Sequence, residues 1–90
     1  MTKKKMKEVL ERSIYVDEFV YRVRSLEGNE KMAQLHRDDA NHTESIAATL
    51  ELVTYEEADE IREKAWEAAR QHIKNMKFLE EHPELLEREA

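Results

Sequence analysis

The chain has no cysteine, a single glycine, a single proline and no long apolar segment among its 90 residues. Without cysteine, disulfide bonds and thiolate chemistry are excluded, and a reducing compartment suits the chain. The scarcity of glycine and proline disfavours an all-β domain, which needs turn residues at short intervals. No segment approaches the roughly 18 apolar residues of a transmembrane helix, and no apolar signal-peptide core follows the first lysines. We therefore expect a helical, cytoplasmic protein without a membrane partner.

Charged residues, by contrast, make up 40% of the chain, and the formal net charge is −6. A general nucleic-acid binder needs an excess of lysine and arginine to displace counterions from phosphate, so we expect no direct nucleic-acid partner. The charge is unevenly distributed, because residues 1–7 are basic whereas residues 82–90 form an acidic tail. We interpret both ends as parts of one small domain that covers residues 1–90.

Residues 54–81 carry the clearest structural signal. Thr54 and Glu57 have the spacing of a capping box, in which each side chain binds the backbone N–H of the other residue at a helix start. Pro83 predicts that the helix ends near His82, because the residue before proline avoids helical geometry. Four alanines on the apolar side would let another helix approach closely: Ala58, Ala65, Ala68 and Ala69. We expect one uninterrupted helix, around which a mainly α small bundle or helical hairpin is built.

Residues 14–53 allow two interpretations. Residues 3–13 have a helical pattern, but the apolar stripe rotates by roughly a quarter turn after Ser13. Residues 19–23 are rich in β-formers, and residues 27–30 could form a turn. The alternative to the all-helical fold is therefore an α+β fold in which a β-hairpin at about residues 19–37 packs on the long helix. In both folds we expect a loop at residues 38–40. The segment that follows alternates like a strand at residues 46–52, but its alanines and glutamates and the capping-box-like pair of Asn41 with Glu44 favour a helix.

The densest group of potential metal ligands lies in this ambiguous region and comprises His36, Asp38, Asp39 and His42. If the segment is helical, His36, Asp39 and His42 face broadly one way. A metal site needs three or four ligands that converge on one point, and no paired motif supplies the missing one. We therefore predict no metal site. The sequence also indicates no cofactor and no catalytic residue, because only Gly28 is available for a phosphate loop and the serines lack a nucleophile motif.

One short motif resembles an enzyme family. Glu56, Glu57 and Glu60 spell E-E-x-x-E at a helix start, which resembles half of the metal site of MazG-like nucleotide pyrophosphohydrolases. The resemblance implies an all-α enzyme whose carboxylates hold magnesium. That family carries a second E-x-x-D pair further along the bundle, and the following segment of this sequence has none. Glutamates are also favoured at helix N-termini by the helix dipole, so we keep the enzyme as an alternative and expect a non-enzymatic protein.

The function that the sequence favours is protein interaction. We expect a small acidic regulator, adaptor or inhibitor, of the kind found among bacterial and phage accessory proteins, that docks a helical surface on a partner protein. Trp66 and Phe78 are the candidate anchors, because buried aromatic side chains carry much interface energy. Four residues would add electrostatic complementarity: Glu56, Glu60, Glu63 and Glu67. The small size also indicates a homodimer. A further alternative is an acidic nucleic-acid mimic that blocks a DNA-binding protein.

Overall fold

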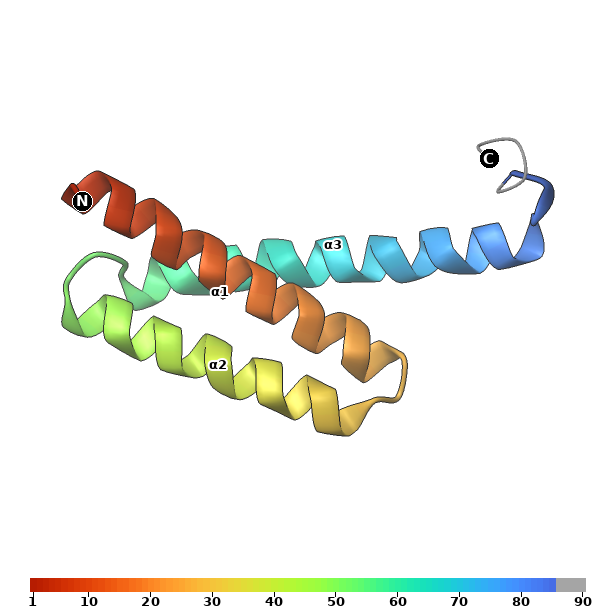
Figure 1. Ribbon diagram of the computed structural model, residues 1–90, viewed down its shortest axis with the longest axis horizontal. Helices are drawn as coiled ribbons and strands as arrows, with labels where there is room; N and C mark the ends of the chain where they lie inside the picture. The colour runs from red at the N-terminus through yellow and green to blue at the C-terminus, as the bar shows by residue number, and fades with distance from the viewer. Residues whose placement is uncertain (86–90) are drawn as a thin grey trace.

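The computed structural model of the chain describes residues 1–85 and contains three α-helices in that range, with no strand (Figure 1). They are α1 (Lys3–Leu26), α2 (Glu30–Thr49) and α3 (Tyr55–Glu81). The expected mainly α fold is confirmed. The β-hairpin at residues 19–37 is wrong, because those residues form the end of α1, the connecting turn and the start of α2. None of the three helices has the length and apolarity needed to cross a membrane.

The helix α1 is the centre of the arrangement. It forms an antiparallel pair with α2, which we call the α1/α2 hairpin, and it also packs along α3, whereas α2 and α3 scarcely meet. The last turns of α3 project beyond the hairpin (Figure 1), which gives a molecule of 49 × 27 × 19 Å. Because α1 packs on two neighbours from two sides, its apolar residues occupy more than one face. The rotation of the apolar stripe after Ser13 therefore reflects a continuous helix with two partners, not a break.

Each helix begins at a side-chain cap that the sequence provides. Thr2 and Asn29 accept hydrogen bonds from the backbone N–H groups three residues on and start α1 and α2. The predicted capping box of α3 is confirmed, since the side chains of Thr54 and Glu57 each bind the other's backbone N–H at 3.1 Å. Between α1 and α2, Gly28 has a φ of 83°, a conformation that glycine adopts without steric cost.

Two predictions about α2 are wrong. Residues 38–40, expected to be a loop, lie in the middle of this helix, and Asn41 is an interior residue and not a cap. The reason is that α2 buries only a thin stripe of alanines spaced seven residues apart, namely Ala33, Ala40 and Ala47. The remaining positions are mostly polar, so the local sequence resembles a solvated loop. The helix forms because that stripe packs on α1, which is a tertiary effect that short-range patterns do not reveal.

The core is small and rich in alanine. Ile14, Ala47, Val53 and Ala58 form its centre, where the start of α3 meets the hairpin. Of the nine buried apolar residues in the described part of the chain, six are alanines, and only Ile14, Val23 and Val53 are larger. The sheltered alanine face predicted for α3 is confirmed by three residues that are fully buried: Ala58, Ala65 and Ala69. Close helix contact thus replaces bulky side chains as the main source of apolar burial.

A contact outside the core holds the two helix starts together. The Lys7 Nζ atom donates to Glu57 Oε2 at 2.8 Å and joins the first turns of α1 to the start of α3. This hydrogen bond, with those from the backbone and hydroxyl of Thr54, lowers the pKa of the Glu57 carboxyl below its ordinary value. The pair is exposed, so its main effect is to fix the position of the cap.

The turn between α2 and α3 contains a strained residue. Glu51 has a φ of 57°, in the left-handed region that non-glycine residues occupy at a cost. The residue follows the end of α2, where glycine is the usual choice. We expect Glu51→Gly to raise the free energy of unfolding by about 0.5–1 kcal/mol, measured by urea denaturation followed by circular dichroism. Glu51→Ala is the control, because it removes the same side-chain charge but keeps Cβ; equal stability of the two variants would contradict the strain.

Candidate functional site

A buried carboxylate links all three helices. Glu18 of α1 has no solvent exposure, and its two oxygens accept hydrogen bonds from Arg22 Nε and Arg62 Nε, both at 2.6 Å. Arg62, on α3, also donates through Nη1 to Glu44 Oε2 of α2 at 2.7 Å. Within residues 1–85, no buried side-chain nitrogen or oxygen lacks a hydrogen-bond partner. The sequence gives no local signal for this network, because the Glu18–Arg62 contact spans 44 positions.

The charges in this network stabilise one another. Burial of Arg62 acts to lower the pKa of its guanidinium, but the hydrogen bond and charge of Glu18, together with Glu44, outweigh it and raise the pKa above its ordinary value. Arg62 therefore stays charged, and so its contacts hold α3 against α1 and α2. Paired and fully hydrogen-bonded ions of this kind fix the relative position of helices more than they add stability. We assign the network a structural role.

Trp66, one of the two predicted anchors, lies next to this network and is only half-buried. The guanidinium of Arg22 lies 4.7 Å from the centre of its ring, and that of Arg70 lies 4.9 Å from it. The indole is therefore held by two cation–π contacts at the α1–α3 junction. Two of the protein's own arginines therefore lie over the ring.

The predicted acidic residues of α3, Glu56, Glu60, Glu63 and Glu67, are all exposed. Glu63 borders a shallow surface depression whose other walls include Arg22, Arg62 and Trp66. We call Glu56, Glu60, Glu63 and Glu67 the acidic strip. Positively charged side chains lie beside it at Glu63. The other predicted anchor, Phe78, is 51% exposed on the projecting end of α3, and its ring stacks on His82 at a centroid distance of 4.2 Å.

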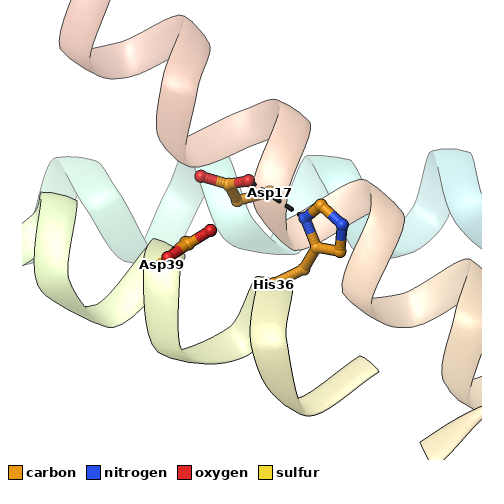
Figure 2. A group of neighbouring side chains, drawn as sticks. All are labelled: Asp17, His36 and Asp39. Carbon is orange, nitrogen blue, oxygen red and sulfur yellow. Dashed lines mark hydrogen bonds and ion pairs between the residues drawn. The ribbon is translucent and has the colours of Figure 1, made fainter. Parts of the chain in front are cut away.

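The histidine and aspartate cluster predicted in the middle of the chain is partly assembled (Figure 2). His36 and Asp39 share a side of α2, and Asp17 of α1 joins them, with one potential ligand atom from each residue within 4.8 Å of the others. His36 Nδ1 lies 3.2 Å from Asp17 Oδ1. His42 is not in this group. Asp17 lies 19 positions before His36, so only the pairing of the two helices reveals its membership.

The cluster offers an imidazole and two carboxylates at the seam between α1 and α2. Asp17 and His36 are half-buried, whereas Asp39 is exposed. These three groups match the donor types of divalent-cation sites, which require at least one further ligand. We call these three side chains, Asp17, His36 and Asp39, the polar centre of the α1/α2 hairpin.

Around this polar centre lie six large apolar side chains outside the core, which we call the hairpin face: Val9, Val16, Met32, Leu35, Ile46 and Leu50. Each is 39–55% exposed. A hollow of about 380 Å³ lies on α1 among Val9, Arg12, Ser13, Val16 and Asp17. A second hollow of about 220 Å³ lies on α2, where Ile46 and Leu50 form part of its wall. The sequence does not indicate this surface, because the surface forms only where α1 and α2 lie side by side.

The hairpin face points away from α3. Glu18 of α1 and Glu44 of α2 both reach toward Arg62 of α3. At 100° per residue, Val9 and Val16 lie roughly 160–180° around α1 from Glu18. Leu35 and Ile46 lie about the same angle around α2 from Glu44. The two helices therefore bind α3 on one side and present apolar side chains on the other.

Other predicted features are placed as follows. His72, which lies in register with the apolar residues of α3, is exposed, and its ring meets Phe19 at 5.7 Å in an edge-to-face contact. Glu56, Glu57 and Glu60, which carry the resemblance to MazG-like enzymes, do not form a group with ligand atoms close enough to hold a metal in the described part of the chain. The acidic tail beyond residue 85 lies outside the described residues.

Comparison of the chain with known protein families, with curated proteins and with solved structures finds no match.

Proposed function

We propose that this protein is a non-enzymatic interaction module that acts as a regulator, adaptor or inhibitor by docking its hairpin face on a partner protein. The observation that carries the proposal is the hairpin face itself. Six large apolar side chains are exposed there, whereas only three apolar residues larger than alanine are buried within residues 1–85. Monomeric proteins keep large contiguous apolar patches out of water unless the patch binds something. The cysteine-free composition agrees with activity in the reducing cytoplasm.

The polar groups of the hairpin face support the same conclusion. Interfaces combine an apolar centre with a few polar groups that fix the orientation of the partner. Here the Asp17–His36 pair and the exposed carboxylate of Asp39 lie between the apolar rows of the two helices. Arg12 adds a cation at the border of the α1 hollow. The partner that fits is a protein surface with apolar side chains and both kinds of charge.

The anchors expected from the sequence define a second surface, on α3. Phe78 is available there, whereas Trp66 is covered by Arg22 and Arg70. A nucleic-acid mimic would bind a basic cleft through Glu56, Glu60, Glu63 and Glu67. The nearest cations, Arg22 and Arg62, are already paired with Glu18 and Glu44, so the negative potential of these carboxylates supports the mimic as a second candidate. The hairpin face is the stronger candidate, because six large apolar side chains are exposed there.

The test compares three variants for capture of proteins from an extract of the source organism, with mass spectrometry as the readout. Leu35→Glu/Ile46→Glu charges the hairpin face, and Met76→Glu/Phe78→Glu makes the same chemical change on α3. We expect a defined set of proteins, which includes the chain itself if it self-associates, to be captured by wild type and the α3 variant. The same set should be lost with the hairpin-face variant.

The third variant reverses the charge of the acidic strip at Glu56, Glu60 and Glu63 to lysine. Unchanged capture by this variant excludes the nucleic-acid mimic, whereas selective loss of a DNA-binding protein supports the mimic and contradicts the hairpin face. Loss of the captured set only with Met76→Glu/Phe78→Glu would move the docking surface to α3. The enzyme alternative has its own readout: a stoichiometric heat of magnesium or manganese binding that Glu56→Gln/Glu60→Gln abolishes.

A further inference from the structure

We infer that the partner of the hairpin face is a second copy of this chain, so that two α1/α2 hairpins stack face to face and place α3 on the two outer sides. The inference rests on the proposed function and names the occupant of the same surface. Four helices would then surround a new interface, in which the apolar side chains that one copy leaves exposed flank Asp17, His36 and Asp39. In a two-fold dimer each contact occurs twice. The apolar row of α1 in one copy can then pack on that of α2 in the other copy, and the reverse.

The amount of exposed surface supports this occupant. The chain has a solvent-accessible surface of 6821 Å², whereas a folded monomer of 10.7 kDa averages about 5,500 Å². The elongated shape, in which the end of α3 projects beyond the hairpin, contributes to this excess. Within residues 1–85, half of the exposed large apolar side chains lie on the hairpin face. Part of the excess is therefore apolar surface that a second copy would cover, in an interface that at standard size buries roughly 800 Å² of each partner.

The distribution of charge supports it as well. Two copies that each carry −6 repel one another unless they meet through a neutral region. Residues 1–49, which contain the hairpin, have nine basic and nine acidic residues, so the whole net charge lies in residues 50–90. Stacking the hairpins brings the neutral parts together and keeps the acidic α3 helices on opposite sides. The same geometry would offer a strongly basic partner little attraction, which favours a second copy.

The size of the core supplies the driving force. In the described part of the chain, Ile14, Val23 and Val53 are the only buried apolar residues larger than alanine, so a single copy gains little from apolar burial. Small domains of this kind commonly reach adequate stability through association. Covering Val9, Leu35 and Ile46 with the same residues of another copy would add burial without any change in the helices.

The experiment measures molar mass in solution by sedimentation equilibrium on the full chain. We expect wild type to have twice the 10.7 kDa chain mass and a melting temperature that rises with protein concentration between about 1 and 100 µM, as dimer dissociation requires. Leu35→Glu/Ile46→Glu should be monomeric at the same concentrations. The matched control, Met76→Glu/Phe78→Glu, adds the same charge at similarly exposed positions and should stay dimeric.

If the glutamate variant does not fold, Leu35→Ala/Ile46→Ala replaces it and should weaken the dimer by at least tenfold in dissociation constant. A monomeric wild type with a melting temperature independent of concentration would overturn the second copy. The proposed function would survive that result if the capture experiment still shows a partner lost with the hairpin-face variant. A dimer that Met76→Glu/Phe78→Glu dissociates and Leu35→Glu/Ile46→Glu does not would also overturn the inference, because it places the interface on α3.

Discussion

Replacing Glu18 with alanine is expected to lower the free energy of unfolding by about 3–5 kcal/mol, the usual cost of removing one partner from a buried ion pair. The carboxylate has no solvent exposure and receives hydrogen bonds from Arg22 and Arg62. Without it, Arg62 keeps only Glu44, and its charge stays partly buried. Since small proteins are stable by about 5–15 kcal/mol, this loss is a large fraction of the total. Urea denaturation at fixed protein concentration measures it.

A double variant separates the missing charge from the missing packing. Glu18→Leu/Arg62→Met replaces both members of the pair by apolar side chains, and we expect it to recover part of the stability lost in Glu18→Ala, because the guanidinium left without Glu18 is removed, while Glu44 loses its hydrogen bond from Arg62 but keeps 13% exposure to water. Arg22 is less buried than Arg62, so water can solvate it after the change. A Glu18→Ala variant within 1 kcal/mol of wild type, or a double variant less stable than the single one, would contradict this account.

The parts of the fold that local chemistry controls could be predicted from the sequence. The capping box at Thr54 and Glu57 marks the start of α3, and the proline rule places its end at His82, which is its C-cap. Both signals act within a few residues. The alanine face of α3 was also predictable, because a strong 3.6-residue period over 27 residues leaves one interpretation.

The course of residues 14–53 could not be predicted, since there the deciding contacts are distant in sequence. In α1, Val16, Phe19, Val20 and Val23 share a helical face, but this face is rotated from the apolar face of residues 3–13, because the helix packs on two neighbours. In α2, polar residues such as Asp39 surround a narrow buried stripe of alanines. Local pattern rules look for one broad apolar face per helix, and neither helix has one.

The same limit applies to the candidate site. His36 and Asp39 were expected to face one way, and they do, because both lie on one helix. Asp17 could be added only after α1 and α2 were paired. The hairpin face is also a property of two helices together, whereas the predicted anchors Trp66 and Phe78 both lie on α3 alone. Surfaces that form between helices require the register of the pair, which the sequence alone does not provide.

Ala65→Leu is the second change with a large expected effect, because it tests the close contact between α1 and α3. Ala65 is fully buried, and on the same helix Arg62 and Trp66 both contact residues of α1. Three added carbon atoms have no space there unless the helices separate. We expect the free energy of unfolding to fall by about 1–3 kcal/mol, the usual cost of overpacking. A separation of the helices would also lengthen the Glu18–Arg62 contact and add to the loss.

The matched control is Ala68→Leu, which makes the same substitution three residues later at a position that keeps some exposure to solvent. We expect its loss to be less than half that of Ala65→Leu, because the new side chain can turn toward water. Thermal denaturation followed by circular dichroism at one protein concentration compares the two. If Ala65→Leu is as stable as wild type, the alanines of α3 do not set the distance between the helices. Bulky side chains would then fit between α1 and α3, and the small core would no longer explain the need for a partner.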